Sequence, residues 1–189
     1  MNTKRLGKIG GAWWLAGLLG VGGFGTAYAH HVIVDTDYVL KNKDKPGVVL
    51  VDARAAADYK KGLIPGAAVL GEKGGAVVLR DVDARVLPVN KLEKILGEAG
   101  ITRENEIIVY GAKGDTGPDV VFWILEYLGA GKAKVYHGGF DDWTAGKHPL
   151  TNEPRKLPAA KFTAKVRPDV IATTDYVKKN LQNKEIQFL

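Results

Sequence analysis

The sequence predicts an α/β fold, in which a parallel sheet carries helices on both faces. Two short apolar runs rich in β-branched residues, at 47–54 (GVVLVDAR) and 106–110 (EIIVY), are typical of fully buried parallel strands. Between and after them, the stretch at 90–101 (NKLEKILGEAGI) spaces its apolar residues like a helix, and 119–129 (DVVFWILEYLG) is apolar nearly all round. Strands that alternate with helices in this way indicate a three-layer domain.

Three further elements are predicted before the strand at 106–110. Residues 36–42 carry a short helical pattern that Thr36 or Asp35 can cap, because a side-chain oxygen accepts the free N–H groups of a first turn. The stretch at 55–62 (AAADYKKG) predicts a short helix, and 63–70 (LIPGAAVL) predicts a turn that leads into a strand.

The elements around the long helices are set by glycine and polar residues. Residues 71–88 are rich in Gly and charge and predict a loop. Asn90 is the expected cap of the next helix, and Gly100 is its expected stop. The stretch at 134–146 (KVYHGGFDDWTAG) predicts a strand, a Gly-Gly turn and a short helix.

Composition and charge exclude several classes of protein. The chain has 189 residues, of which 46% are apolar and 25% charged, as in folded globular domains. The net charge is +6, but Lys4, Arg5 and Lys8 supply half of it and no basic run follows, so no nucleic-acid partner is expected. The chain contains no Cys and no Ser, which excludes disulfides and thiol or serine nucleophiles within it.

The first 29 residues have the shape of a cleaved signal peptide. A basic start (MNTKRLGK) precedes an apolar stretch and then Ala27, Tyr28 and Ala29, where small residues suit cleavage after Ala29. A membrane anchor is the alternative, but the apolar stretch is short against the roughly 20 residues that span a bilayer. We therefore expect residues 1–29 to be a signal peptide and the mature protein to be periplasmic or secreted, with no stable membrane span.

The C-terminal part repeats the start of the mature chain. Residues 151–168 contain three prolines and little periodicity, so they predict a linker. After them, 170–180 (VIATTDYVKKN) matches 32–42 (VIVDTDYVLKN) in eight of eleven positions. Because an internal repeat indicates a repeated structural unit, we expect one domain at 30–150 and the start of a truncated second copy at 169–189.

Three stretches resemble the rhodanese domain, and the repeat resembles the tandem sulfurtransferases that have two such domains. Residues 48–67 (VVLVDARAAADYKKGLIPGA) resemble the family's strand ending in D-x-R, followed by a helix and an I-P-G-A turn. Residues 107–111 (IIVYG) resemble the strand that leads into the active-site loop, and 135–150 (VYHGGFDDWTAGKHPL) resemble the closing signature. The resemblance implies a rhodanese-like three-layer fold and a thiosulfate or 3-mercaptopyruvate sulfurtransferase.

The loop after the strand at 106–110 lacks the catalytic Cys of the family. In active rhodanese domains this loop opens with a Cys, whose thiolate takes a sulfane sulfur and is stabilised by loop N–H groups and a helix N-terminus. The resemblance places Gly111 at that position and Thr116 near the place of an Arg that active members often carry. We therefore expect a silent active-site loop, formed by Gly111, Ala112, Lys113, Gly114, Asp115 and Thr116.

Other motif residues are interpreted as structural. The D-x-R pair is expected to fix neighbouring loops through charge-assisted hydrogen bonds. These structural residues are Asp52, Arg54, Pro65, Gly66, Gly138, Gly139 and Trp143. Mercaptopyruvate-type members often carry a His where this chain has Leu63 or Ile64, which favours thiosulfate.

No metal ion and no cofactor is expected. The glycine-rich loop does not fit a nucleotide-binding motif, because Gly117 is followed by Pro118 rather than Lys. A small sulfur anion could still bind to the loop N–H groups.

Two functions remain open from the sequence. In the first, the parent protein is an exported sulfurtransferase that moves sulfur from thiosulfate to an acceptor such as cyanide, through a Cys persulfide in the second domain. In tandem members the first domain is typically inactive, so the missing second domain of the same chain would be the partner. The alternative is a non-catalytic rhodanese-like binding or docking module.

Overall fold

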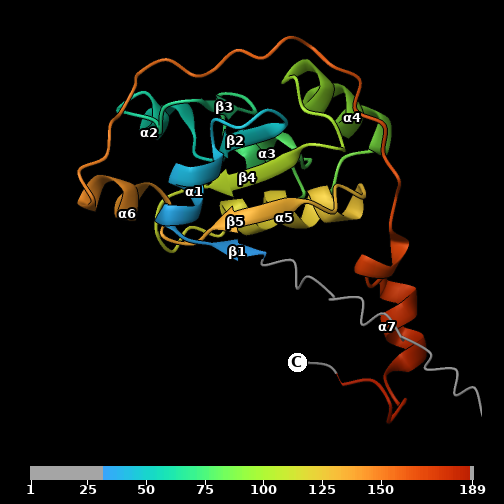
Figure 1. Ribbon diagram of the computed structural model, residues 1–189. Helices are drawn as coiled ribbons and strands as arrows, with labels where there is room; N and C mark the ends of the chain where they lie inside the picture. The colour runs from blue at the N-terminus through green and yellow to red at the C-terminus, as the bar shows by residue number, and fades with distance from the viewer. Residues whose placement is uncertain (1–31, 188–189) are drawn as a thin grey trace, which may run out of the picture.

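The computed structural model describes residues 32–187, and Figure 1 shows them as one sheet between helices, followed by a C-terminal helix that stands apart. The predicted signal peptide at 1–29 lies outside the described residues. Among the residues that are described, no helix is both long and apolar enough to cross a membrane.

A five-stranded sheet with all neighbours parallel forms the centre, in the order β1-β5-β4-β2-β3. The α/β prediction with a parallel sheet is therefore confirmed. The strands are β1 (Ile33–Val34), β2 (Val48–Asp52), β3 (Ala67–Val69), β4 (Glu106–Tyr110) and β5 (Ala133–Tyr136).

Each face of the sheet is covered by its own set of helices. Alternate residues of a strand point to opposite faces, and along β2 Val49 and Val51 join one core cluster while Val48 and Leu50 join the other. The first cluster includes residues of α4 (Val89–Glu98) and α5 (Gly117–Tyr127) and packs beside α3 (Gly75–Val78); the second includes residues of α1 (Thr36–Asn42), α2 (Ala56–Tyr59) and α6 (Gly139–Ala145).

Two local predictions were wrong. The helix α4 begins at Val89 after Pro88, so Asn90 lies inside its first turn and is not its cap. Pro88 is the N-cap, with an extended backbone (ψ 142°), and its carbonyl accepts the N–H of Leu92 at 3.1 Å as the first bond of the helix. The predicted loop at 71–88 also contains the four-residue helix α3.

Residues 151–170, which we call the C-terminal strap, run in extended form over the domain and end in a short 3-10 helix, η1 (Pro168–Val170). Their N–H groups meet carbonyls at helix ends, which have no partner inside the helix. Ala160 donates to the Gly97 carbonyl at the end of α4 (2.8 Å), and Lys165 donates to the Leu128 carbonyl after α5 (2.9 Å). The segment predicted as a linker is thus held on the domain; its joining of two domains stays a prediction.

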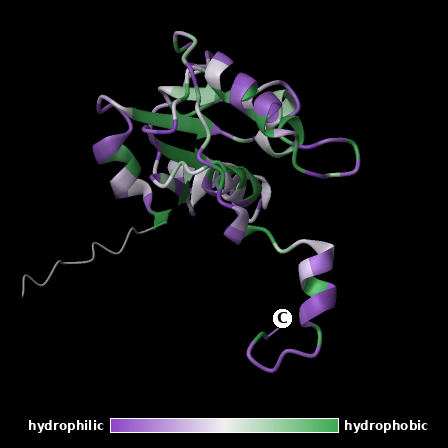
Figure 2. Cartoon of the chain, turned by 90° about the vertical axis from the view of Figure 1, so that its right-hand side faces the viewer, coloured by the Kyte–Doolittle hydropathy of each residue, from purple (hydrophilic) through white to green (hydrophobic). Residues whose placement is uncertain are grey.

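The last helix, α7 (Thr174–Asn180), has no buried residue. Figure 2 shows it standing away from the domain, with mostly polar colours, whereas the strands inside the domain have largely apolar colours.

Candidate functional site

The predicted silent loop lies at the carboxyl edge of the sheet, between β4 and α5. Open α/β sheets place their ligands at this edge. Gly111 is buried, whereas the residues from Ala112 to Thr116 are exposed. The loop lines a small depression together with Asp119 of α5 and His137 after β5.

Side-chain carboxylates of the chain itself occupy N–H groups of this loop. The Asp115 Oδ1 atom accepts the N–H of Gly117 at 2.8 Å, and the Asp141 Oδ2 atom accepts the N–H of Lys113 at 2.7 Å. Helix N-termini and loop N–H groups attract anions, and here two of these groups are already paired with internal anions. Two N–H groups that could bind an external anion are therefore already bound to carboxylates of the chain.

The space that a side chain would need at Gly111 is filled. A Cβ atom built on Gly111 would lie 2.8 Å from Pro118 Cγ, 3.0 Å from Pro118 Cδ and 3.0 Å from Asp115 Oδ2. The Pro118 ring is part of the first turn of α5 and cannot rotate away. The loop therefore differs from a cysteine loop by more than one missing thiol.

The Gly-Gly turn closes the loop from the other side. Gly139 has φ +57°, which favours glycine, and a Cβ on it would lie 2.3 Å from the Gly111 carbonyl oxygen. That carbonyl accepts the N–H of Phe140 at 2.8 Å. Gly138 is similarly crowded by the side chain of Asp142. Gly138 and Gly139 therefore allow α6 to start directly against the loop.

Lys113 offers no replacement nucleophile. Its Nζ atom lies 3.0 Å from Asp142 Oδ1, and this hydrogen bond and charge raise the pKa of Lys113 above its ordinary value. A lysine with a raised pKa stays protonated and has no lone pair for attack. The loop thus contains no activated nucleophile.

Asp52 and Arg54 form a buried ion pair behind the loop. The Arg54 guanidinium donates to both carboxylate oxygens of Asp52, with the Nη2–Oδ2 distance 2.6 Å, and it donates to the Gly62 carbonyl at 2.8 Å. Its Cζ atom lies 3.8 Å from the centroid of the Phe140 ring, a cation–π contact. Burial alone would lower the pKa of Arg54, but the hydrogen bond and charge of Asp52 raise it overall, so the arginine is held charged.

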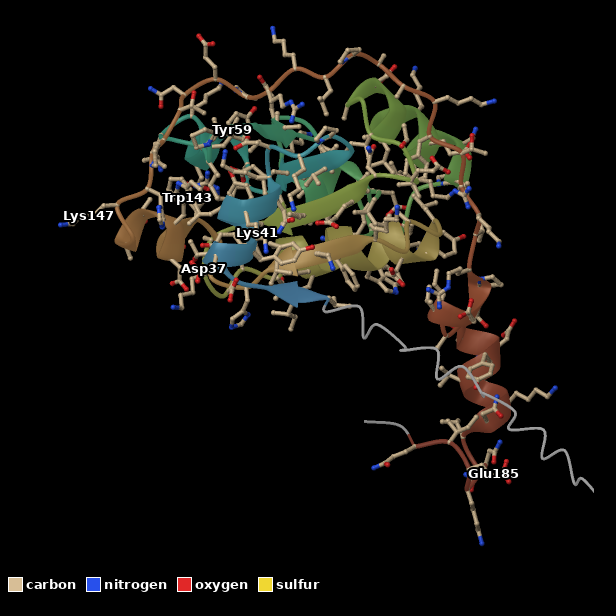
Figure 3. The ribbon with its side chains drawn as sticks, viewed as in Figure 1. Asp37, Lys41, Tyr59, Trp143, Lys147 and Glu185 are labelled. Atoms are coloured by element: carbon tan, nitrogen blue, oxygen red, sulfur yellow. The ribbon has the colours of Figure 1, made fainter. Side chains whose placement is uncertain are left out.

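The other predicted structural residues lie around this pair. Trp143 of α6 is buried and its Nε1 donates to the Pro149 carbonyl at 2.8 Å (Figure 3). Pro65 and Gly66 form the turn before β3, where Gly66 has φ +88°. The N–H of the preceding Ile64 donates to the Tyr110 hydroxyl at 3.1 Å, which ties this turn to the end of β4.

Four residues that close the loop were missed by sequence reasoning. Pro118, Phe140, Asp141 and Asp142 all touch the loop or its ion pairs. The two aspartates follow the predicted Gly-Gly turn after Phe140, and this position is the one available signal that they could reach the loop. Within residues 32–187, no group of three His, Asp or Glu side chains is placed to hold a metal ion.

Comparison with known proteins identifies the family of the domain. Residues 35–146 match the family described as "Rhodanese-like domain". "Putative thiosulfate sulfurtransferase 1" of Mycobacterium bovis is 30% identical over 137 residues, which are 70% of this chain and 48% of the relative. "Thiosulfate sulfurtransferase" of Azotobacter vinelandii is 32% identical over 114 residues, which are 60% of this chain and 41% of the relative. The chain thus spans about half or less of the length of these relatives.

A solved structure shows the same fold. The crystal structure of SseA from Escherichia coli, described as a 3-mercaptopyruvate sulfotransferase with the rhodanese fold, superposes on this chain with a TM-score of 0.74 at 21% identity. The superposition covers 83% of this chain and 64% of SseA.

Proposed function

The chain belongs to the rhodanese-like family, and on that premise we propose that it carries the non-catalytic domain of a sulfurtransferase. The observation that carries the proposal is Gly111, which the resemblance places at the Cys position of active members and whose Cβ space is filled by Pro118 and Asp115. The chain has no Cys at any other position. A soft thiolate is the reagent that sulfane-sulfur transfer needs, so this domain cannot supply it.

The catalytic Cys would then belong to a second rhodanese-like domain of the same chain. Its thiolate would attack the outer sulfur of thiosulfate, forming a persulfide while the sulfur–sulfur bond of thiosulfate breaks and sulfite leaves. Cyanide would next attack the persulfide sulfur, giving thiocyanate and the free thiolate. The repeat of 32–42 at 170–180 and the names of the relatives support this reading.

We further propose that a small sulfur anion binds at the silent loop once a carboxylate of the loop is displaced. The loop precedes an 11-residue helix whose N-terminus favours anions. To reach the N–H groups of Lys113 and Gly117, the anion would have to displace Asp141 or Asp115.

Export to the periplasm or the exterior is proposed on the sequence of residues 1–29 alone. The basic start, the apolar stretch and Ala27-Tyr28-Ala29 support it.

The alternative of a non-catalytic docking module shares the silent loop and differs in the second domain. Incubation of the chain with thiosulfate and cyanide tests the silent loop directly: no thiocyanate above a heat-inactivated control is expected, and turnover would contradict the proposal. Reading the coding DNA past codon 189 separates the two functions. An Asp-x-Arg followed by a strand and a Cys in a Gly-rich loop would support the sulfurtransferase, and their absence would favour the docking module.

A further inference from the structure

The helix α5 carries large apolar side chains on the side that lies opposite its buried residues. Val120, Trp123 and Tyr127 recur at spacings of three and four residues, so they share one side of the helix. Val121 and Leu125 belong to the other side and are buried in the core. We call the first three residues the α5 stripe; each of them is half-buried. A helix that is apolar on both sides is typical of one that a further layer covers.

The C-terminal strap ends on this helix. The Arg167 N–H donates to the Tyr127 carbonyl at 2.8 Å, and the Arg167 guanidinium lies 2.8 Å from a carboxylate oxygen of Glu126. Further along, the Trp123 Nε1 donates to the Val170 carbonyl at 3.1 Å, a bond that we call the anchor. The chain is therefore held on α5 as far as Val170, and Figure 1 shows it passing the end of that helix before α7.

A glycine after α5 gives the strap room to approach. Gly129 has φ +81°, and a Cβ atom on it would collide with the Lys165 carbonyl oxygen. The Lys165 N–H in turn donates to the carbonyl of Leu128, at the end of the helix. Domains joined by a mobile linker move relative to each other, whereas this linker leaves the domain from a fixed position.

The anchor is made at the residue where the repeated unit begins. Val170 corresponds to Val32 in the repeat of 32–42 at 170–180. The Val32 carbonyl accepts the N–H of Val135 in β5 at 2.8 Å, which attaches the start of β1 to the sheet. Because a carbonyl oxygen has two lone pairs, the Val170 carbonyl can accept the Trp123 indole and an equivalent strand of a second unit together. The first strand of that unit would then start directly on α5.

The reach of the chain after Val170 limits where the second unit can lie. The helix α7, which corresponds to α1, begins at Thr174, and four extended residues span at most about 14 Å. In the first unit, α1 packs directly on the sheet, where its Val39 is fully buried. A second unit built in the same way would have its first strand, its first helix and the edge of its sheet beside α5.

We propose that the second rhodanese-like unit of this chain docks on the outer side of α5 and covers the α5 stripe. The anchor between Trp123 and Val170 fixes where the unit starts, and the pair of Arg167 with Glu126 holds the strap in register. The proposal rests on the second unit proposed above and adds the surface that receives it.

The anchor can be tested in this chain by NMR of the indole N–H groups. Trp123→Phe identifies the Trp123 signal, which we expect to exchange slowly with solvent. Arg167→Gln removes the ion pair with Glu126 and should speed this exchange several-fold. Arg155→Gln is the matched control on the same strap, because it keeps the backbone N–H that donates to the Ala67 carbonyl at 2.7 Å. A Trp123 signal that exchanges equally fast in both variants would overturn the anchor.

The docking can be tested by hydroxyl-radical oxidation of this chain and of the longer gene product that carries the second unit. Trp123 and Tyr127 should be oxidised several-fold more slowly in the longer protein, because the second unit covers them. Tyr38 is the matched control: it is half-buried like Tyr127, but it lies on the other face of the sheet and should be oxidised equally in both proteins. Equal oxidation of Tyr127 in the two proteins would overturn the docking, while the argument on Gly111 would stand. A gene without a second unit would instead overturn the proposed function.

A charge placed in the α5 stripe gives an independent check. Val120→Glu should leave the single thermal transition of this chain and split the transition of the longer protein into two. Leu40→Glu, at a position that is 41% exposed on α1, should split neither. One unsplit transition in the longer Val120→Glu protein would contradict the docking. This chain should sediment as a monomer; a dimer that Val120→Glu abolishes would show that a second copy covers the stripe and would overturn the proposal.

Discussion

The Cγ atom of Pro118 lies 2.8 Å from the point where a Cβ on Gly111 would stand. Asp115 Oδ2 lies 3.0 Å from the same point. A thiol introduced at this position would be crowded by a rigid ring, and the neighbouring carboxylate would raise its pKa, because like charges disfavour the thiolate. The loop therefore lacks the space for a thiol side chain and the positive environment that stabilises a thiolate, as well as the Cys itself.

Replacing Arg54 by Ala should destabilise the domain strongly. The change leaves the Asp52 carboxylate buried without its partner and removes the bond to the Gly62 carbonyl. Breaking a buried ion pair costs about 3–5 kcal/mol, which urea unfolding measures. Lys61→Ala is the matched control, because its pair with Asp58 is exposed and should cost less than about 1 kcal/mol. Equal losses would show that the D-x-R pair does not hold this edge of the sheet.

Replacing Gly97 by Ala should loosen the C-terminal strap. Gly to Ala in a helix ordinarily stabilises by about 0.5–1 kcal/mol, but here the Cβ would lie 2.5 Å from the Ala160 carbonyl oxygen. We expect a loss of about 1–3 kcal/mol from overpacking and faster tryptic cleavage at Lys156 and Lys161 of the strap. Gly131→Ala, with no atom within 4 Å of its Cβ, should change neither. Unchanged cleavage in Gly97→Ala would contradict the tight docking of the strap.

Alkaline pH should destabilise the domain partly through Tyr38. Burial and the hydrogen bond to Glu106 raise the pKa of Tyr38 to about 12 in the folded state, against about 10 in an unfolded chain. Since the folded pKa is the higher one, the contribution is fully present below pH of about 10 and is lost as pH rises toward 12. As the pH rises between these values, the free energy of unfolding measured by urea titration should fall less for Tyr38→Phe than for the unchanged chain. Identical pH slopes for both chains would exclude this contribution.

Local patterns predicted most of the fold. The β-branched runs of β2 and β4, the apolar α5 and the short α1 with its Asp35 cap each carry their signal within a few residues. The start of α4 was missed because Asn90 and Pro88 are both plausible helix starts, and the choice between them depends on packing of the whole helix.

The closure of the loop could not be predicted from the sequence. Gly111 could be placed by resemblance, but Asp141 is 28 residues from the Lys113 N–H that it accepts. Likewise, the contact between the strap and Gly97 joins residues that are distant in the chain. Such contacts depend on the three-dimensional path of the backbone, which no local periodicity encodes.

The most direct test of the silent loop is the single variant Gly111→Cys, assayed for thiocyanate with thiosulfate and cyanide. The chain has no other Cys, so any turnover must come from this thiol. Ala112→Cys, which places a thiol on the exposed neighbouring residue, is the matched control. We predict that Gly111→Cys forms no more thiocyanate than Ala112→Cys and that its thiol reacts more slowly with Ellman's reagent. Turnover by Gly111→Cys well above that of Ala112→Cys would show that the loop can still hold a catalytic thiolate and would contradict a silent loop.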